Sequence, residues 1–449
     1  HSTVAGGYNT KAAAAAGIPP FKEEDLFKTG LQQTNSTVNP QLLLTLIRKG
    51  GETLDWIGDL GFEWEPYGPV GCVPKGVFGR TWLLMQKETT DFLTEVAGEK
   101  GVEFLFKSKA AALVRENGRI VGVQGESEGE SLFVKARKAV ILAAGGMSNN
   151  REMLKKYVPR AYYGCSSAYD MPCNTGEAIR MGTGAGADLA GIDSFSQFDA
   201  GTAYFDEGLG PWYRYLYTGD IQLARQPWLK VNKLCDRFMA EDCNPLYFGP
   251  TSVVEISQPG GRVYVIFDSN YERNILAFDS QFCEKPLTPD LPGMDKWDES
   301  ICPKDWRVAV KEAIEKGAIK HADTIEGLAS ELGLDPVKFK KTVETYNGYC
   351  AEGKDPEFGM NPKYLIPVQD PPFYGVKVGP QLEVTYCGLR VNPQMQVLDK
   401  DCNIIPGLYA AFHTAGGAVG ENVAVHSILF NCGLAYTSGY IAGDNAAAE

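Results

Sequence analysis

The sequence predicts an α/β fold in which one domain is interrupted by the insertion of a second domain. Two stretches, 140–146 and 408–420, read as buried strands that run into glycine loops, and the second leads into a helix of small residues. Such turns are common in α/β proteins. At 449 residues the chain is too long for one ordinary core. We therefore expect two domains, one of them discontinuous.

The first part of the chain predicts helices followed by a β-meander. Asn39-Pro40 is a helix start, and apolar residues at helical spacing follow within 39–105, which closes with an expected strand at Val102–Phe106. Residues 113–136 alternate like a meander, with Asn117-Gly118 as the hairpin turn. The apolar run Val140–Ala144 predicts a fully buried strand that ends in two glycines.

The composition changes at Gln226-Pro227-Trp228, where we place the entry to the inserted domain. Asp370–Phe373 marks its exit. Inside the insert we expect a strand at Val263–Asp268 and helices at His321–Gly333 and Asp335–Tyr349. Closer to the C-terminus, Pro406-Gly407 predicts a turn before the strand 408–411.

Composition and charge exclude several classes of protein. Hydrophobic residues make up 44% of the chain and charged residues 22%, which is ordinary for a globular protein, and no apolar run is long enough to span a bilayer. A net charge of −13 argues against nucleic-acid partners and anionic membrane surfaces. The 11 cysteines show no C-x-x-C spacing, so we expect no metal site, and their odd number favours a reducing, cytoplasmic location.

Several motifs together resemble the flavoproteins of the fumarate reductase/succinate dehydrogenase family, which bind FAD. The resemblance covers nearly the whole chain. The motifs are Ala5-Gly6-Gly7-Tyr8-Asn9, Lys138–Gly146, Thr175-Gly176-Glu177-Ala178, Pro227–Asn232, Arg237-Phe238, Phe267-Asp268, His321–Thr324 and Ile404–Asn422. It implies a discontinuous Rossmann-like FAD-binding domain, 1–225 and 374–449, around an α+β substrate cap, 226–373.

One part of the family pattern is missing from the sequence. Members open with a strand, a G-x-G-x-x-G turn and a helix whose N-terminus takes the pyrophosphate of the cofactor. No such turn occurs near the start, and His1-Ser2-Thr3-Val4-Ala5-Gly6-Gly7 resembles the loop that follows it in the family. Either the natural protein has an opening unit of this kind that the sequence lacks, which is the preferred expectation, or the protein is a degenerate relative of the family.

The resemblance also implies a set of residues around a noncovalently bound FAD. The meander is expected to lie against the adenosine half, glycines to let the backbone approach the cofactor, and His413 to replace the glutamate that usually binds the ribose. The expected cofactor contacts are Ala5, Gly6, Gly7, Ala110, Ala144, Gly145, Gly146, Tyr409, Ala410, His413, Gly417, Asn422, Ser427 and Ile428.

In the family, hydride passes between flavin N5 and one substrate carbon while a side chain handles the proton on the neighbouring carbon. Fumarate reductases clamp the two carboxylates of the substrate with two arginines. This chain has neither: no arginine follows Arg237-Phe238 within 242–247, and Val423 follows Gly420-Glu421-Asn422. A dicarboxylate is therefore a poor match.

Three residues are candidates for the proton transfer and for binding the substrate. Tyr247 lies near the tyrosine of related ketosteroid dehydrogenases, although two residues out of register, and a phenol can protonate a carbanion. Tyr386 stands near the position of a family histidine, and His426 either donates to the substrate or caps the last helix. Trp212, Tyr213 and Tyr215 are expected to add aromatic area to the pocket.

The preferred hypothesis is an FAD-dependent ene-reductase that reduces or desaturates an activated C=C bond in a hydrophobic, conjugated small molecule. The electron donor is open, with reduced flavin, a quinone or a cytochrome as candidates. A 3-ketosteroid dehydrogenase is an alternative, against which Val425 stands where a carbonyl-binding tyrosine is implied. A non-catalytic flavin-binding or electron-transfer subunit is the third alternative.

Overall fold

The computed structural model describes residues 5–66, 71–75, 82–168, 170, 172–202, 223–224, 226–242, 250–277, 306–420 and 430–449. The chain forms two compact units. Unit 1 comprises His1–Val158, Asp170–Ser196 and Val384–Glu449, and unit 2 comprises Pro159–Tyr169 and Gln197–Glu383.

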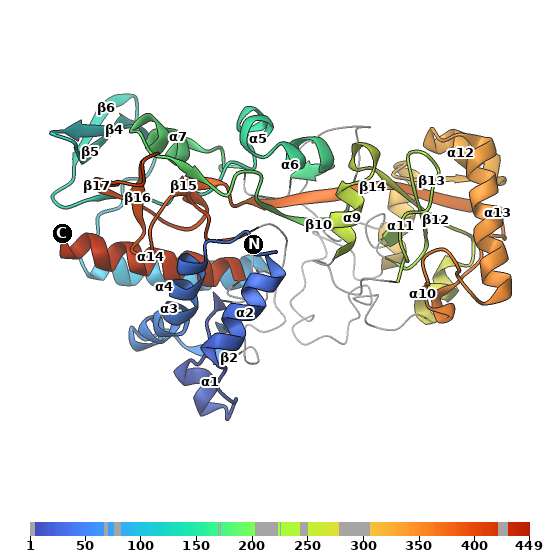
Figure 1. Ribbon diagram of the computed structural model, residues 1–449, viewed down its shortest axis with the longest axis horizontal. Coiled ribbons are helices and arrows are strands. Elements are labelled where there is room, and N and C mark those ends of the chain that lie inside the picture. Colours follow the sequence, from blue (N-terminus) through green and yellow to red (C-terminus); the bar gives the residue numbers. More distant parts are fainter. Residues whose placement is uncertain are drawn as a thin grey trace. The chain divides into compact units, whose positions relative to one another are not determined.

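Unit 1 combines small sheets with helices, as Figure 1 shows. Its described helices are α1 (Lys11–Ala15), α2 (Glu23–Gln33), α3 (Pro40–Asp59), α4 (Trp82–Glu99), α5 (Arg151–Tyr157), α7 (Glu177–Gly184) and α14 (Phe430–Ala448). Its described strands are β1 (Ala5–Gly6), β2 (Trp64–Pro66), β3 (Gly71–Pro74), β4 (Ser108–Glu116), β5 (Arg119–Ser127), β6 (Glu130–Lys135), β7 (Val140–Leu142), β9 (Leu189–Ala190), β15 (Gly388–Arg390), β16 (Gln396–Leu398), β17 (Ile404–Ala410) and β18 (Ala415–Gly416).

Helix α3 begins and packs as the sequence predicts. The Asn39 side chain caps α3 by accepting hydrogen bonds from the backbone N–H groups of Gln41 and Leu42. One face of α3, which includes Leu42, Leu46 and Leu54, is fully buried. Helix α14 packs on α3 and on β1 (Figure 1). The α3–α14 layer therefore forms the support for the N-terminal strand.

The meander is confirmed. Strands β4, β5 and β6 form an antiparallel sheet, and the β4–β5 turn consists of Asn117 and Gly118, both with positive φ. A neighbouring sheet has the order β16-β17-β7, in which β17 and β7 are parallel.

Three local predictions for unit 1 are wrong. Val102–Phe106 forms no strand, and Phe106 is 77% exposed, because no described strand pairs with this segment. Val140–Ala144 is not fully buried: within the described residues β7 pairs only with β17, and Ile141 is 39% exposed. Pro406-Gly407 makes no turn before the strand but lies inside β17, opposite a register shift in β16.

Unit 2 is built on a sheet in which β10, β14, β12 and β11 are neighbours and β13 and β8 also pair with β14. The chain passes between the units within β10 and β14. Its described strands are β8 (Ser167–Ala168), β10 (Phe195–Thr202), β11 (Leu229–Asn232), β12 (Val263–Phe267), β13 (Ile319–Ala322) and β14 (Phe373–Thr385). Its described helices are α6 (Pro159–Gly164), α9 (Pro250–Ile256), α10 (Tyr271–Ala277), α11 (Trp306–Glu315), α12 (Ile325–Leu332) and α13 (Pro336–Glu352), with short 3-10 turns between them.

The core of unit 2 buries all five residues of β12 beneath apolar side chains of α12 and α13. The predicted strand at Val263–Asp268 and the helix at Asp335–Tyr349 are confirmed as β12 and α13. The helix predicted at His321–Gly333 is confirmed only from Ile325 on, as α12, because His321 and Ala322 pair with β14 as part of β13. Leu229 of β11 and Gly375 of β14 both lie opposite Ile266. Compact unit 2 is larger than the predicted cap, because it also includes 159–169, 197–225 and 374–383. The boundaries of the cofactor domain and the cap remain a prediction.

Candidate functional site

The turn after β7 favours glycine at both Gly145 and Gly146. Gly145 has φ +79°, and a Cβ built on it would lie 2.1 Å from Asn174 Oδ1. A Cβ on Gly146 would lie 2.6 Å from Thr385 Oγ1. Both distances are far below van der Waals contact, so any side chain would push these neighbours away.

Two threonines fix this turn through neutral hydrogen bonds. Thr414 Oγ1 donates to the carbonyl of Gly145 at 2.9 Å. Thr385 Oγ1 accepts the N–H of Met147 at 3.0 Å. Segments far apart in the sequence, 385 and 414, therefore hold the predicted cofactor-contacting glycines in one geometry.

Tyr386 and His413 come together beside this turn. Their rings meet edge to face with centroids 5.5 Å apart, and the His413 ring stacks on Phe412. The Tyr386 hydroxyl is buried and lies 2.9 Å from Asn431 Oδ1, to which it donates. Both residues are candidates from the sequence, and the structure brings them together. Their roles toward a cofactor or a substrate remain predictions.

The first turns of α14 connect this region to the N-terminal strand. A Cβ on Gly433 would lie 2.2 Å from the carbonyl oxygen of Gly6, so helix and strand are in backbone contact. Five residues later, Ser438 Oγ accepts the N–H of Phe412 at 2.9 Å. Gly7 is packed in the same way against Gly50 of α3. The glycines predicted at the start of the chain thus have a packing role in the structure.

Three further described candidates, Tyr409, Ala410 and Gly417, lie on or after β17. The Tyr409 hydroxyl donates to Glu449 Oε1 at 2.6 Å, so its polar end points toward the C-terminus of the chain. Ala410 is buried and its N–H donates to Met395 O at 3.1 Å. Gly417 has φ +81°, and its carbonyl accepts the N–H of Asn39.

Eight candidates lie outside the described residues. They are Trp212, Tyr213, Tyr215, Tyr247, Asn422, His426, Ser427 and Ile428.

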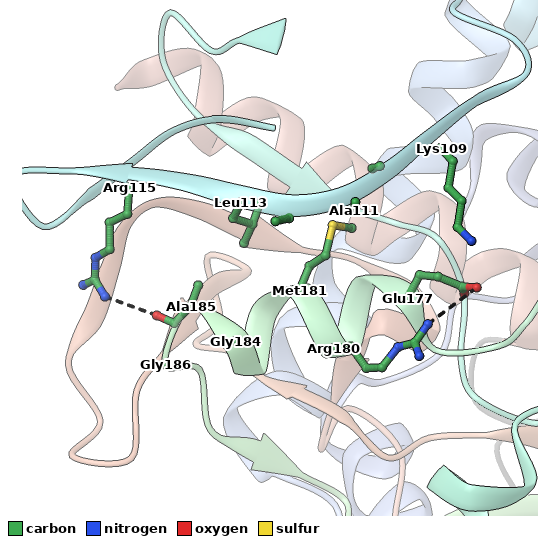
Figure 2. A pocket seen from close by; sticks show the side chains of 12 residues that line it. Lys109, Ala111, Leu113, Arg115, Glu177, Arg180, Met181, Gly184, Ala185 and Gly186 are labelled. Carbon is green, nitrogen blue, oxygen red and sulfur yellow. Dashed lines mark hydrogen bonds and ion pairs between the residues drawn. The ribbon is translucent and has the colours of Figure 1, made fainter. Parts of the chain in front are cut away.

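Ala110 lines a cavity of about 780 Å³ between β4 and α7, shown in Figure 2. The wall formed by β4 is largely apolar, while the rim carries Lys109, Arg115, Arg180 and Glu177. Arg115 Nη1 donates a hydrogen bond to the carbonyl oxygen of Ala185 at 3.2 Å. Arg180 Nη2 lies 3.9 Å from Glu177 Oε1, and Figure 2 shows both contacts as dashed lines. Because the rim carries three cationic side chains and one carboxylate, the cavity suits an anionic ligand.

The basic residues of this cavity were missed in the sequence. A signal was available, because Lys109, Leu113 and Arg115 occupy odd positions of the strand and so share one of its faces. The partner helix supplies Arg180, one turn after Glu177. Only the packing of α7 against β4 shows that the two sets of side chains meet.

The described residues fit the expected FAD. Ala143 and Ala144 are exposed directly before the glycine turn, which gives a flat ring or a phosphate chain access to small side chains and backbone. The cavity at Ala110 carries an excess of cationic side chains, which suits an anionic group. No group of three or more potential metal ligands occurs among the described residues. No helix in the described part of the chain has the length and apolarity needed to cross a membrane.

Comparisons with known proteins place these features in a family. The chain is 28% identical over 436 residues to a vinyl phenol reductase of Lactiplantibacillus plantarum, covering 94% of this chain and 83% of that protein. It is also 28% identical over 433 residues to a urocanate reductase of Eggerthella lenta, covering 91% of this chain but only 62% of that protein. The chain therefore spans most of the first relative and less than two thirds of the second.

Among solved structures, an open conformation of a flavocytochrome c3 fumarate reductase superposes with a TM-score of 0.67 at 25% identity, covering 99% of this chain and 71% of that one. A family model described as an FAD binding domain matches residues 6–425. That match covers nearly the whole chain, as the motifs that resemble the FAD-binding flavoproteins led us to expect. The protein therefore belongs to the FAD binding domain family and is a flavin-dependent oxidoreductase with FAD as its cofactor.

Proposed function

We propose that the protein reduces an activated C=C bond in a flat, largely apolar, conjugated small molecule. The observation that carries this proposal is the absence of arginine from 242–247 and from the position after Asn422. These are the places where the fumarate reductases to which the chain is similar hold two carboxylates. Similarity to a vinyl phenol reductase supports a substrate without a dicarboxylate.

A free-energy argument supports the same substrate class. Burying a carboxylate without a charged partner costs several kcal/mol, about 3 kcal/mol or more per group. Two such groups on fumarate would lose far more binding energy than an aromatic or enone substrate, which needs only one or two hydrogen bonds. We therefore expect fumarate to be a poor substrate.

In this proposal the residues of the chain position the reactants and move a proton. When bound and reduced by an electron donor, FAD would supply the hydride. The turn at Gly145–Gly146 presents backbone rather than side chains to the cofactor, and Thr385 and Thr414 keep that turn rigid. Tyr247 donates the proton to the substrate carbon next to the one that receives hydride. The Tyr386 hydroxyl is already bonded to Asn431, so a substrate contact there requires this bond to be shared or exchanged.

The first experiment tests the reaction and substrate class. Purified protein carrying FAD is photoreduced without oxygen, and reoxidation of the flavin is followed with a vinyl phenol, a cinnamate, a simple enone, a 3-keto steroid and fumarate. Rapid reoxidation by the conjugated compounds and slow reoxidation by fumarate is the expected pattern. Efficient fumarate turnover would contradict the substrate class, the steroid alone would favour a ketosteroid enzyme, and no reoxidation would favour an electron-transfer subunit.

A second experiment tests the proton donor. Tyr247→Phe should lower turnover of the best substrate by about 100-fold or more, the usual scale for a lost general acid, while FAD content and photoreduction stay unchanged. Tyr163→Phe is the control, since Tyr163 is 54% exposed and lies outside the candidate set. An unimpaired Tyr247→Phe variant would assign the proton transfer to another residue. The electron donor, whether reduced flavin, quinone or cytochrome, stays a prediction to be tested with the same reduced enzyme.

A further inference from the structure

In unit 1, the glycine turn after β7 is joined by hydrogen bonds to the segment 170–175, which leads into α7. The backbone N–H of Asn149 donates to the carbonyl oxygen of Asn174 at 3.0 Å. The Asn150 side chain donates from Nδ2 to the carbonyl oxygen of Thr175 at 2.9 Å. Because both bonds end on backbone oxygens of consecutive residues, the two segments lie beside each other in one register.

The Asn174 side chain reaches from this segment to the glycine turn. A Cβ built on Gly145 would lie 2.1 Å from Asn174 Oδ1 and 3.0 Å from its Cγ. The amide therefore occupies the space that a side chain at 145 would need. Glycine at this position lets the Asn174 amide approach the backbone of the turn directly.

Asp170 determines which end of the amide faces the turn. Its side chain is fully buried, and its Oδ1 accepts a hydrogen bond from Asn174 Nδ2 at 2.7 Å. A carboxylate accepts hydrogen bonds, and only the nitrogen of a side-chain amide donates them. The nitrogen is therefore directed to Asp170, and the oxygen is directed to Gly145.

Asn174 Oδ1 is left as an acceptor at an accessible place. No group in the described part of the chain donates a hydrogen bond to it, and Asn174 and Gly145 are both partly exposed. Ala143 and Ala144, which come directly before the turn, are exposed as well. These small residues are the ones that fit the expected FAD, so the oxygen lies at the edge of the surface available to the cofactor. An acceptor that gains a donor there contributes to binding.

We propose that Asn174 is a cofactor-binding residue, whose Oδ1 accepts a hydrogen bond from a donor group of FAD. The donor is a hydroxyl of one of its sugar chains or an N–H of one of its rings. The pyrophosphate is excluded as the partner, because phosphate oxygens and an amide oxygen are all acceptors. The inference concerns the cofactor alone and does not depend on the substrate proposed above.

The first test measures the affinity for FAD and needs no substrate. FAD is removed, and its binding to the apoprotein is followed by the change in flavin fluorescence. Asn174→Ala should raise the Kd for FAD by about 3–10-fold, the usual effect of one lost hydrogen bond.

Asn150→Ala is the matched control. It removes a bond between the same two segments, and both polar ends of the Asn150 side chain are bonded to backbone groups, those of Thr175 and Met153. This variant should lower the melting temperature but leave the Kd within about 2-fold of the wild type. An equal rise of Kd in both variants would show that Asn174 acts only through packing and would overturn the inference.

The second test identifies the donor on FAD. The same titration is made with analogues that each lack one donor, by methylation of flavin N3, dimethylation of adenine N6, or replacement of a ribityl or ribose hydroxyl with hydrogen. The analogue that lacks the partner of Asn174 should bind the wild type about 3–10-fold more weakly than FAD, and should bind Asn174→Ala as tightly as FAD does.

Three results would overturn the inference and leave the proposed function intact. The first is an unchanged Kd for FAD in folded Asn174→Ala. The second is a set of analogues in which each loses the same affinity in the variant as in the wild type, since no donor is then coupled to Asn174. The third is failure of both Asn174→Ala and the milder Asn174→Ser to fold, which would assign the residue to stability.

Discussion

Two buried regions, one in each unit, are held together by different kinds of contact. In unit 1, the glycine cluster, which consists of Gly6, Gly145, Gly146 and Gly433, is held by backbone contacts and by neutral hydroxyl groups such as that of Thr414. In unit 2, buried ionised side chains pair with one another, and we call them the ion cluster: Lys230, Arg237, Glu241, Glu255 and Asp355. The first arrangement depends on side chains being absent, whereas the second depends on both partners being present.

This difference determines how substitutions destabilise each region. Adding one carbon at Gly433 creates a steric clash with the backbone of Gly6, which can move only if whole elements shift, whereas at Gly145 or Gly146 the added carbon would displace the side chain of Asn174 or Thr385. Removing one partner from the ion cluster leaves a charge buried without compensation, which is more costly. Substitutions in unit 2 should therefore have the larger effects on stability.

The largest effect is expected for Arg237→Met. The substitution leaves Glu241 and Asp355 buried without their cation, and it should lower the free energy of unfolding by about 3–5 kcal/mol. Urea unfolding at neutral pH measures this change in the free energy of unfolding. Lys340→Met, which breaks an exposed pair with Glu326, is the matched control and should cost less than about 1 kcal/mol. Equal effects of the two substitutions would show that burial does not govern these pairs.

A smaller loss is expected for Gly433→Ala in unit 1. The new methyl carbon would lie 2.2 Å from Gly6 O, so α14 or β1 must shift, and the free energy of unfolding should fall by about 1–3 kcal/mol. Gly439→Ala is the control in the same helix. Nothing lies within 4 Å of a Cβ at Gly439, and alanine there should stabilise the protein by about 0.5–1 kcal/mol. In thermal unfolding, the melting temperature should fall for Gly433→Ala and rise for Gly439→Ala; a change of the same sign in both variants would contradict the prediction.

The smallest effect concerns pH. Burial alone would raise the pKa of Asp355, but hydrogen bonds from Arg237 and from the N–H groups of Glu357 and Met360 lower this pKa from 3.8 to about 2. A depressed pKa stabilises the fold above the unfolded value, and this contribution is lost as pH falls from about 4 to about 2. The cost of Asp355→Asn relative to wild type should therefore shrink by on the order of 1 kcal/mol between pH 5 and pH 2.5. A difference independent of pH would mean that the carboxylate is not stabilised by Arg237.

Local patterns in the sequence were reliable where the signal and the structure depend on the same few residues. The cap at Asn39 and the Asn117-Gly118 turn are examples, because each is specified by the chemistry of one or two side chains. Patterns failed where a partner was needed. Val102–Phe106 has the composition of a strand, but a strand also requires a neighbour, and no described segment supplies one.

The sequence by itself determined the α/β class, the meander, the family and its cofactor, because these follow from periodicity and from motifs in a given order. The tertiary structure alone decided that Tyr386 meets His413, that Arg180 joins Lys109 at one cavity, and that Lys230 contacts both Glu241 and Glu255. Each of these contacts joins residues whose proximity depends on how elements pack or strands pair. No local pattern of side chains encodes that packing, because it results from burying apolar surface across the whole unit.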